Sequence, residues 1–88
     1  MRRIKVVGFE DPMQRMLLHN VEAAIRDLKC EFTIDIIHDI NDIIKMEKAQ
    51  IIVTPALIVD SHILCEGHIW NVEHIKYFLN KICRSDTE

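Results

Sequence analysis

The sequence predicts one small α/β domain whose elements follow the order strand, helix, strand, helix, strand, strand, helix. Three observations predict it: short runs rich in β-branched residues, longer segments with apolar residues at helical spacing, and a two-residue polar turn between two short apolar runs. The 88 residues suit a single domain, and the 49% hydrophobic content can supply its core. We expect the domain to span residues 1–84, followed by a frayed polar tail at 85–88.

The first strand and the first helix are separated by a sharp change of pattern. An apolar run from Ile4 to Gly8 is typical of a buried strand. Asp11 and Pro12 then form a favourable N-cap and first helical residue. Apolar residues at helical spacing predict a helix over 12–29, with an inward stripe of Met13, Leu17, Val21, Ala24, Ile25 and Leu28.

The middle of the chain continues with a second strand and a second helix. Residues 31–37 alternate between apolar and polar side chains, which indicates a strand with one wet face. A helix should begin near Asp39 and run to about residue 48 or 49, with Ile40, Ile43 and Ile44 inward. Because a helix joins the first two strands, we expect them to be parallel with a right-handed crossover.

The last part of the chain predicts a hairpin and a final helix. Residues 51–55 bring the chain back, and strands at 56–59 and 62–66 are joined by a tight turn at Asp60 and Ser61, which predicts an antiparallel pair. Asn71 can cap the last helix, whose inward stripe is Ile75, Phe78, Leu79 and Ile82.

Charge and hydropathy exclude several classes of partner. The net charge of −3 gives no electrostatic reason to bind nucleic acid. No apolar run approaches the ~20 residues of a membrane span, and no signal-peptide pattern is visible at the N-terminus. We therefore expect a soluble, cytoplasmic protein without a nucleic-acid or membrane partner.

A family resemblance is carried by Thr54-Pro55-Ala56-Leu57-Ile58-Val59-Asp60, by Gly67, and by the segment 72–76 that opens the last helix. With the element order, these residues make the chain resemble the thioredoxin fold, and within it the small glutaredoxin-like redox-active disulfide proteins. The resemblance implies a four-stranded mixed sheet of order 2-1-3-4 with helices on both faces.

The resemblance also implies that the Thr54–Pro55 bond is cis. The backbone N–H and C=O of Thr54 would then face an extended peptide, which could pair with them as an added strand. The alternative is that Pro55 only begins a strand and fixes a turn.

The chain departs from the family at the place where relatives carry Cys-x-x-Cys, between the first strand and the first helix. Here the sequence reads Gly8-Phe9-Glu10-Asp11-Pro12, and no cysteine precedes position 30. Asp11 falls at or near the position of the nucleophilic cysteine. Together with Glu10 it would repel a thiolate, a glutathione carboxylate or a phosphate. We therefore interpret Asp11 as a helix cap, with no catalytic residue at this place, and the domain as redox-inactive.

The three cysteines, Cys30, Cys65 and Cys83, form neither a metal knuckle nor a redox pair by spacing. In the implied strand order Cys30 and Cys65 lie at opposite edges of the sheet, beyond the roughly 7 Å that a disulfide can bridge. We expect Cys30 and Cys83 to be free cysteines that act as small hydrophobes. Cys65 is the cysteine that could be exposed and reactive, or cross-link two chains.

The five histidines do not predict a metal site. His62, Cys65 and His68 are three residues apart each, but on a strand His62 and Cys65 would point to opposite faces. A zinc site needs ligands that converge. We therefore expect surface histidines, no metal and no cofactor.

The functional prediction is a non-catalytic binding or assembly module with a protein or peptide partner, or a homodimer. Its expected surface, at one end of the sheet, comprises Phe9, Asp11, Pro12, Thr54, Pro55, Gly67 and Trp70. For Trp70 two arrangements are open: it joins this apolar surface, or it packs over the last helix. The alternative function is a thiol-disulfide oxidoreductase that uses Cys65 alone.

Overall fold

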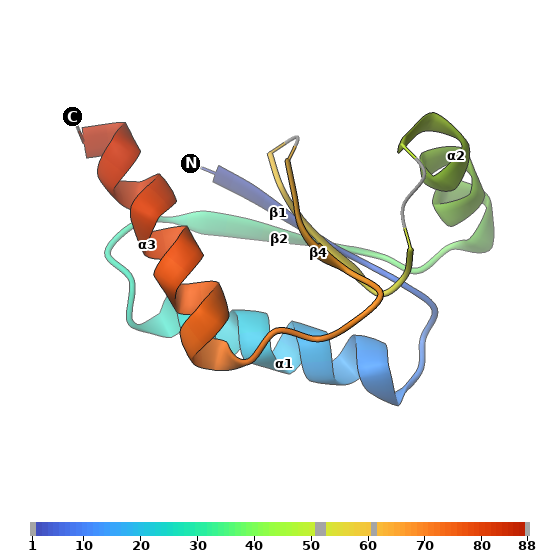
Figure 1. Cartoon of the computed structure of the whole chain (residues 1–88), viewed down its shortest axis with the longest axis horizontal. Helices are drawn as coiled ribbons and strands as arrows, with labels where there is room; N and C mark the ends of the chain where they lie inside the picture. The colour runs from blue at the N-terminus through green and yellow to red at the C-terminus, as the bar shows by residue number, and fades with distance from the viewer. Residues whose placement is uncertain (1, 51–52, 61, 88) are drawn as a thin grey trace.

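The protein is a four-stranded mixed sheet with helices on both faces (Figure 1). The computed structural model describes residues 2–50, 53–60 and 62–87. The elements, in chain order, are β1 (Arg2–Val7), α1 (Pro12–Arg26), β2 (Phe32–Ile37), α2 (Ile40–Gln50), β3 (Ala56–Val59), β4 (His62–Glu66) and α3 (Val72–Thr87). The predicted order of strands and helices is confirmed.

The sheet has the strand order β2-β1-β3-β4, as the resemblance implied. β1 pairs in parallel with β2, and Ile4 lies opposite Ile34. β1 pairs antiparallel with β3, and β3 pairs antiparallel with β4. The parallel crossover and the antiparallel hairpin are therefore both confirmed, and the two apolar strands β1 and β3 form the centre of the sheet.

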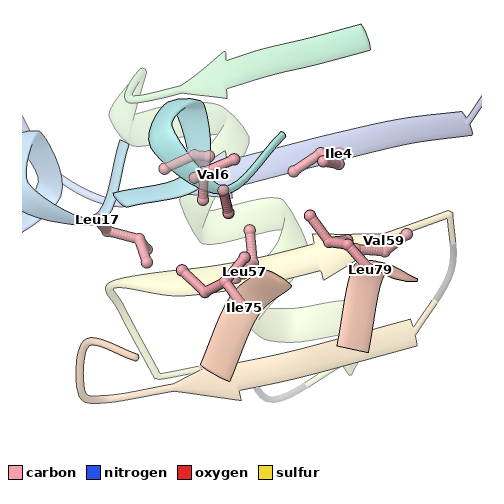
Figure 2. Packing of buried hydrophobic residues seen from close by; sticks show 9 residues of the cluster. Ile4, Val6, Leu17, Leu57, Val59, Ile75 and Leu79 are labelled. Atoms are coloured by element: carbon pink, nitrogen blue, oxygen red, sulfur yellow. The ribbon is translucent and has the colours of Figure 1, made fainter. Parts of the chain in front are cut away.

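The main core lies between the sheet and the helices α1 and α3 (Figure 2). Side chains alternate along a strand, so Ile4 and Val6 of β1 point to the same face as Leu57 and Val59 of β3. They meet a helical stripe that is fully buried: Leu17, Val21 and Ala24 from α1, and Ile75 and Leu79 from α3. This core fixes α1 and α3 side by side on one face.

Among the described helices, α2 alone covers the opposite face, where a smaller core lies. Val7, Ala56 and Ile58 of the sheet pack there against Ile43. Our expectation that Ile40 and Ile44 face inward is wrong, because their exposed fractions are 57% and 41%. α2 meets the sheet through Ile43 and the half-buried Met46. Ile40 is its first residue, and Ile44 lies about 100° round the helix from Ile43.

Two helix boundaries differ from the expected ones. α1 ends at Arg26 rather than near residue 29, because Asp27 is its C-cap and Leu28 N–H donates to the Ile25 carbonyl in a closing turn. α3 continues to Thr87, so the segment expected as a frayed tail is helical up to that residue. Residues 51–52, expected to lead the chain back to the sheet, lie outside the described residues. Ser61, expected in the turn between the last two strands, also lies outside them.

Candidate functional site

The loop between β1 and α1 ends in a well-formed helix cap. Asp11 has an extended backbone (φ −141°, ψ 175°), and its Oδ1 accepts a hydrogen bond from Gln14 N–H at 2.9 Å. Pro12 is the first helical residue, where its missing N–H has no intrahelical partner to lose. The predicted cap is therefore confirmed. The carboxylate occupies backbone donors that a nucleophile at this position would otherwise use.

Sequence reasoning missed Gln14, the buried residue at this end of α1. Its exposed fraction is 4%, and its Nε2 donates to the Val6 carbonyl at 3.1 Å. Within the described part of the chain its Oε1 is buried without a hydrogen-bond partner. Gln14 stands three residues after Asp11, at the spacing of the second cysteine in Cys-x-x-Cys. Counting three residues on from Asp11 would have found it.

Met13 and Phe9 place exposed apolar side chains at this end of the molecule. The exposed fraction of each is 45%. The expectation that Met13 faces the core is therefore wrong. Met13 is only the second residue of α1, and the buried stripe of that helix begins at Gln14 and Leu17.

Gly8 brings this end of α1 together with the Thr54–Pro55 turn. A Cβ at Gly8 would lie 2.5 Å from Gln14 Oε1 and 3.4 Å from Pro55 Cα. Gly8 N–H donates to the Ile37 carbonyl at 3.0 Å. The φ of Gly8 lies outside the left-handed region, so the glycine is required by close packing.

The Thr54–Pro55 peptide bond is cis, and Gly67 holds the turn around it. Gly67 N–H donates to both the Val53 carbonyl (3.0 Å) and the Pro55 carbonyl (2.9 Å). Val53 N–H donates to Glu66 Oε2 at 2.9 Å. Gly67 has φ +76°, in the left-handed region that favours glycine. Among the residues that the structure describes, none is a hydrogen-bond partner of the Thr54 backbone.

Of the expected surface residues, the structure connects the β1–α1 loop with Thr54, Pro55 and Gly67. Trp70 packs over the last helix, which is the second of the two arrangements that the sequence left open. It is half-buried, stacks on His74 of α3 with ring centroids 3.9 Å apart, and contacts Phe78. Its carbonyl accepts from Asn20 Nδ2 at 3.0 Å, so it also ties α3 to α1.

The expectation that Cys30 and Cys83 are free is wrong. They form a disulfide with a Cα–Cα distance of 5.8 Å. Cys30 follows α1 and Cys83 lies on α3, and the packing of these two helices against each other brings the two residues together. The backbone of Cys65 lies in β4 opposite Leu57. Its side chain is outside what the structure describes, so the hypothesis of a reactive Cys65 stays a prediction.

The described residues contain neither a candidate metal cluster nor a membrane-spanning helix. The described residues include no group of three or more His, Cys, Asp or Glu side chains placed to hold a metal ion. His68 accepts a hydrogen bond from Trp70 Nε1 at 3.2 Å. No helix within the described ranges is both long enough and apolar enough to cross a bilayer.

The sheet order, the helices on both faces and the cis-proline turn at the N-terminal end of α1 together define a thioredoxin-like domain. A comparison with protein families supports this class, because the thioredoxin-domain family model matches residues 2–80. The chain belongs to that thioredoxin-domain family. No curated protein and no solved structure matches it.

Proposed function

We propose that the domain binds an extended peptide segment at the surface formed by Phe9, Val53, Thr54 and Pro55. The observation that carries the proposal is the Thr54 backbone, whose N–H and C=O have no partner among the described residues. An extended segment can pair with such groups as an added strand. Its main-chain hydrogen bonds would supply affinity, and neighbouring side chains would supply selectivity.

Exposed apolar side chains flank the Thr54 backbone. Val53 directly precedes it and has an exposed fraction of 56%. Phe9 follows Gly8, which packs against Pro55, and is 45% exposed. An apolar side chain of the bound segment would cover these two residues, and an aromatic residue such as Phe9 suits the centre of a contact.

The charge beside this surface favours one type of segment. Glu10 and Asp11 are both exposed, and the described residues of the β1–α1 loop carry no cation to balance them. A segment with a basic residue next to an apolar one therefore fits better than an acidic segment. The segment can belong to another protein or to a second copy of this chain.

Asp11 and Gln14 at the family's cysteine positions support binding without chemistry at this place. Neither side chain is a thiol, and Asp11 is already engaged as a cap. In this proposal the domain keeps the peptide-facing backbone of the family and performs no thiol exchange there.

The test uses extended peptides selected from a random library for binding to the unmodified chain. Thr54→Pro removes the Thr54 N–H and should weaken binding about tenfold, the upper range for one hydrogen bond. Phe9→Asp, as a separate variant, should weaken peptide binding more than Thr54→Pro does. Thr54→Ala keeps the backbone N–H, and Tyr77→Asp places the same charge on an exposed aromatic of α3 (55% exposed).

These two matched variants should bind like the unmodified chain. Amide resonances of residues 9 and 53–55 should shift when peptide is added. If folded Thr54→Pro and Phe9→Asp variants keep full affinity for the selected peptides, the proposal is wrong. Light scattering of the purified chain distinguishes a second copy from a foreign segment as the partner.

A further inference from the structure

The Cys30–Cys83 disulfide lies at the opposite end of α1 from the proposed peptide surface. Cys30 belongs to the connection between α1 and β2, and Cys83 belongs to the last turns of α3, 53 residues further along the chain. Their Cα–Cα distance of 5.8 Å lies within the usual range for a disulfide. The bond therefore joins α3 covalently to the α1–β2 connection.

The two sulfur-bearing residues differ in their access to solvent. Cys83 is buried, with an exposed fraction of 7%, whereas Cys30 is only half-buried. Both residues line an open hollow of about 350 Å³. Attack on a disulfide depends on access to one of its sulfurs. Cys30 is therefore the sulfur that a small molecule in the hollow would reach first.

Among the described residues that line the hollow, two are cations and one is a carboxylate. Lys29 and Arg84 line it beside the disulfide, and both are exposed. The carboxylate among these described lining residues, Asp27, accepts a hydrogen bond from Lys76 Nζ at 3.0 Å. That hydrogen bond raises the pKa of the Lys76 ammonium above its ordinary value. The hollow therefore suits a small thiol that carries carboxylates of its own, with Lys29 as a cation beside the attacked sulfur.

We propose that Cys30–Cys83 is a thiol-disulfide exchange site for small anionic thiols such as glutathione, which enter the hollow and attack Cys30. The thiolate forms a bond to Cys30 Sγ, the Cys30–Cys83 bond breaks, and Cys83 leaves as a thiolate that takes up a proton. A second thiolate then attacks the sulfur of the bound small thiol. It releases the small-molecule disulfide and leaves Cys30 reduced.

The net reaction converts one protein disulfide and two small thiols into a protein dithiol and one small-molecule disulfide. It removes the covalent link between α3 and the α1–β2 connection and leaves the noncovalent α1–α3 packing in place. Cys30 and Cys83 lie at the other end of α1 from the β1–α1 loop, where the resemblance places the family's cysteines. The proposed exchange site is therefore separate from that loop.

The test follows the redox state of the pair in the full chain, in a Cys65→Ser background. The native protein is incubated with reduced glutathione or with an equal concentration of 2-mercaptoethanol, quenched with acid and alkylated. Mass spectrometry then locates every free thiol and mixed disulfide. We expect glutathione to reduce the native pair, with the transient mixed disulfide on Cys30.

Charge and accessibility each have a matched control. Lys29→Gln should slow reduction by glutathione roughly two- to fivefold, the range for one exposed charge. Reduction by 2-mercaptoethanol should slow less, because its thiolate is its only negative charge. Lys45→Gln, on α2 at the other face, should change neither rate. With oxidised glutathione, Cys30 in Cys83→Ser should react about tenfold faster than Cys83 in Cys30→Ser, because Cys83 is buried.

Three outcomes would overturn the proposal. The pair could stay oxidised in glutathione until the chain unfolds, which would make it a structural link only. The mixed disulfide of the unmutated pair could form on Cys83, which would reverse the assigned attack. The purified chain could also carry no disulfide when isolated without reductant. The location of the mixed disulfide is read in the unmutated pair, so the test does not depend on the cysteine variants folding.

Discussion

The two ends of α1 differ in the chemistry that they hold. At its N-terminal end, where the family resemblance implies cysteines, Asp11 caps the helix and Gln14 is buried against the Val6 carbonyl. Beyond its C-terminal end, Cys30 is bonded to Cys83. A helix N-terminus can stabilise a thiolate, but the loop at the N-terminal end of α1 contains no cysteine. The disulfide lies at the other end of α1, where no helix N-terminus is available to stabilise a thiolate. The proposed thiol exchange and the proposed peptide binding can therefore be tested separately with variants at the two ends.

The largest expected effect comes from breaking the disulfide. Cys83→Ser should lower the free energy of unfolding by about 4 kcal/mol, because a cross-link across 53 residues restricts the unfolded chain. Urea unfolding of the variant and of the unmodified chain, with and without reductant, measures this. Reductant should destabilise the unmodified chain by a similar amount and leave Cys83→Ser unchanged. Equal stability of the two chains without reductant would show that the bond does not stabilise the fold.

A smaller effect is expected at the other end, where Gly8 approaches Gln14. Gly8→Ala should lower the free energy of unfolding by about 1–3 kcal/mol, because its Cβ would lie 2.5 Å from Gln14 Oε1. Moving that side chain away would strain its hydrogen bond to the Val6 carbonyl.

A double-mutant cycle isolates this contact. Gln14→Ala by itself should cost about 1–3 kcal/mol, because it leaves the Val6 carbonyl without its donor. The double variant Gly8→Ala/Gln14→Ala should lose less free energy of unfolding than the sum of the two single variants, by about 0.5 kcal/mol or more. The reason is that the alanine at position 14 no longer clashes with the Cβ at position 8. Additive free energies, measured by urea unfolding of all four chains, would contradict a contact between Gly8 and Gln14.

The sequence predicted those parts of the fold that depend on local pattern. The Asp11 cap and the Pro12 first turn follow from rules that act over three residues, and both are confirmed. The hairpin of β3 and β4 follows from a short turn between apolar runs. The sheet order came from the family resemblance, which rests on the segment around Thr54 and Pro55.

The disulfide could not be predicted in the same way. Strand order excludes a bond between Cys30 and Cys65, but it does not say where the last turns of α3 lie. That depends on where α1 ends and on how α3 packs across it, which helical periodicity does not determine. The same limit explains Ile40 and Ile44, whose spacing fits an inward stripe although α2 meets the sheet mainly through Ile43.

The smallest effect concerns acid and the start of β1, near the disulfide end of the sheet. Asp60 Oδ2 lies 2.6 Å from Arg2 Nη1, and this hydrogen bond, with a second from Arg3 N–H, holds the pKa of Asp60 below its ordinary value of 3.8. A carboxyl whose pKa is lowered by folding stabilises the protein above the unfolded pKa. This contribution is lost as the pH falls through the folded value.

Asp60→Asn should therefore destabilise the protein slightly at neutral pH and by less below pH 3.8. The difference should stay small because both side chains are partly exposed. Urea unfolding of both chains across this pH range measures it, with Asp35→Asn as a control, because Asp35 pairs with the more exposed Arg3. An Asp60→Asn difference that grows as the pH falls would show that Asp60 does not stabilise the fold as a carboxylate. If it instead shrinks as expected, acid weakens this end of the sheet and leaves the Gly8–Gln14 contact, which contains no titrating group, unchanged.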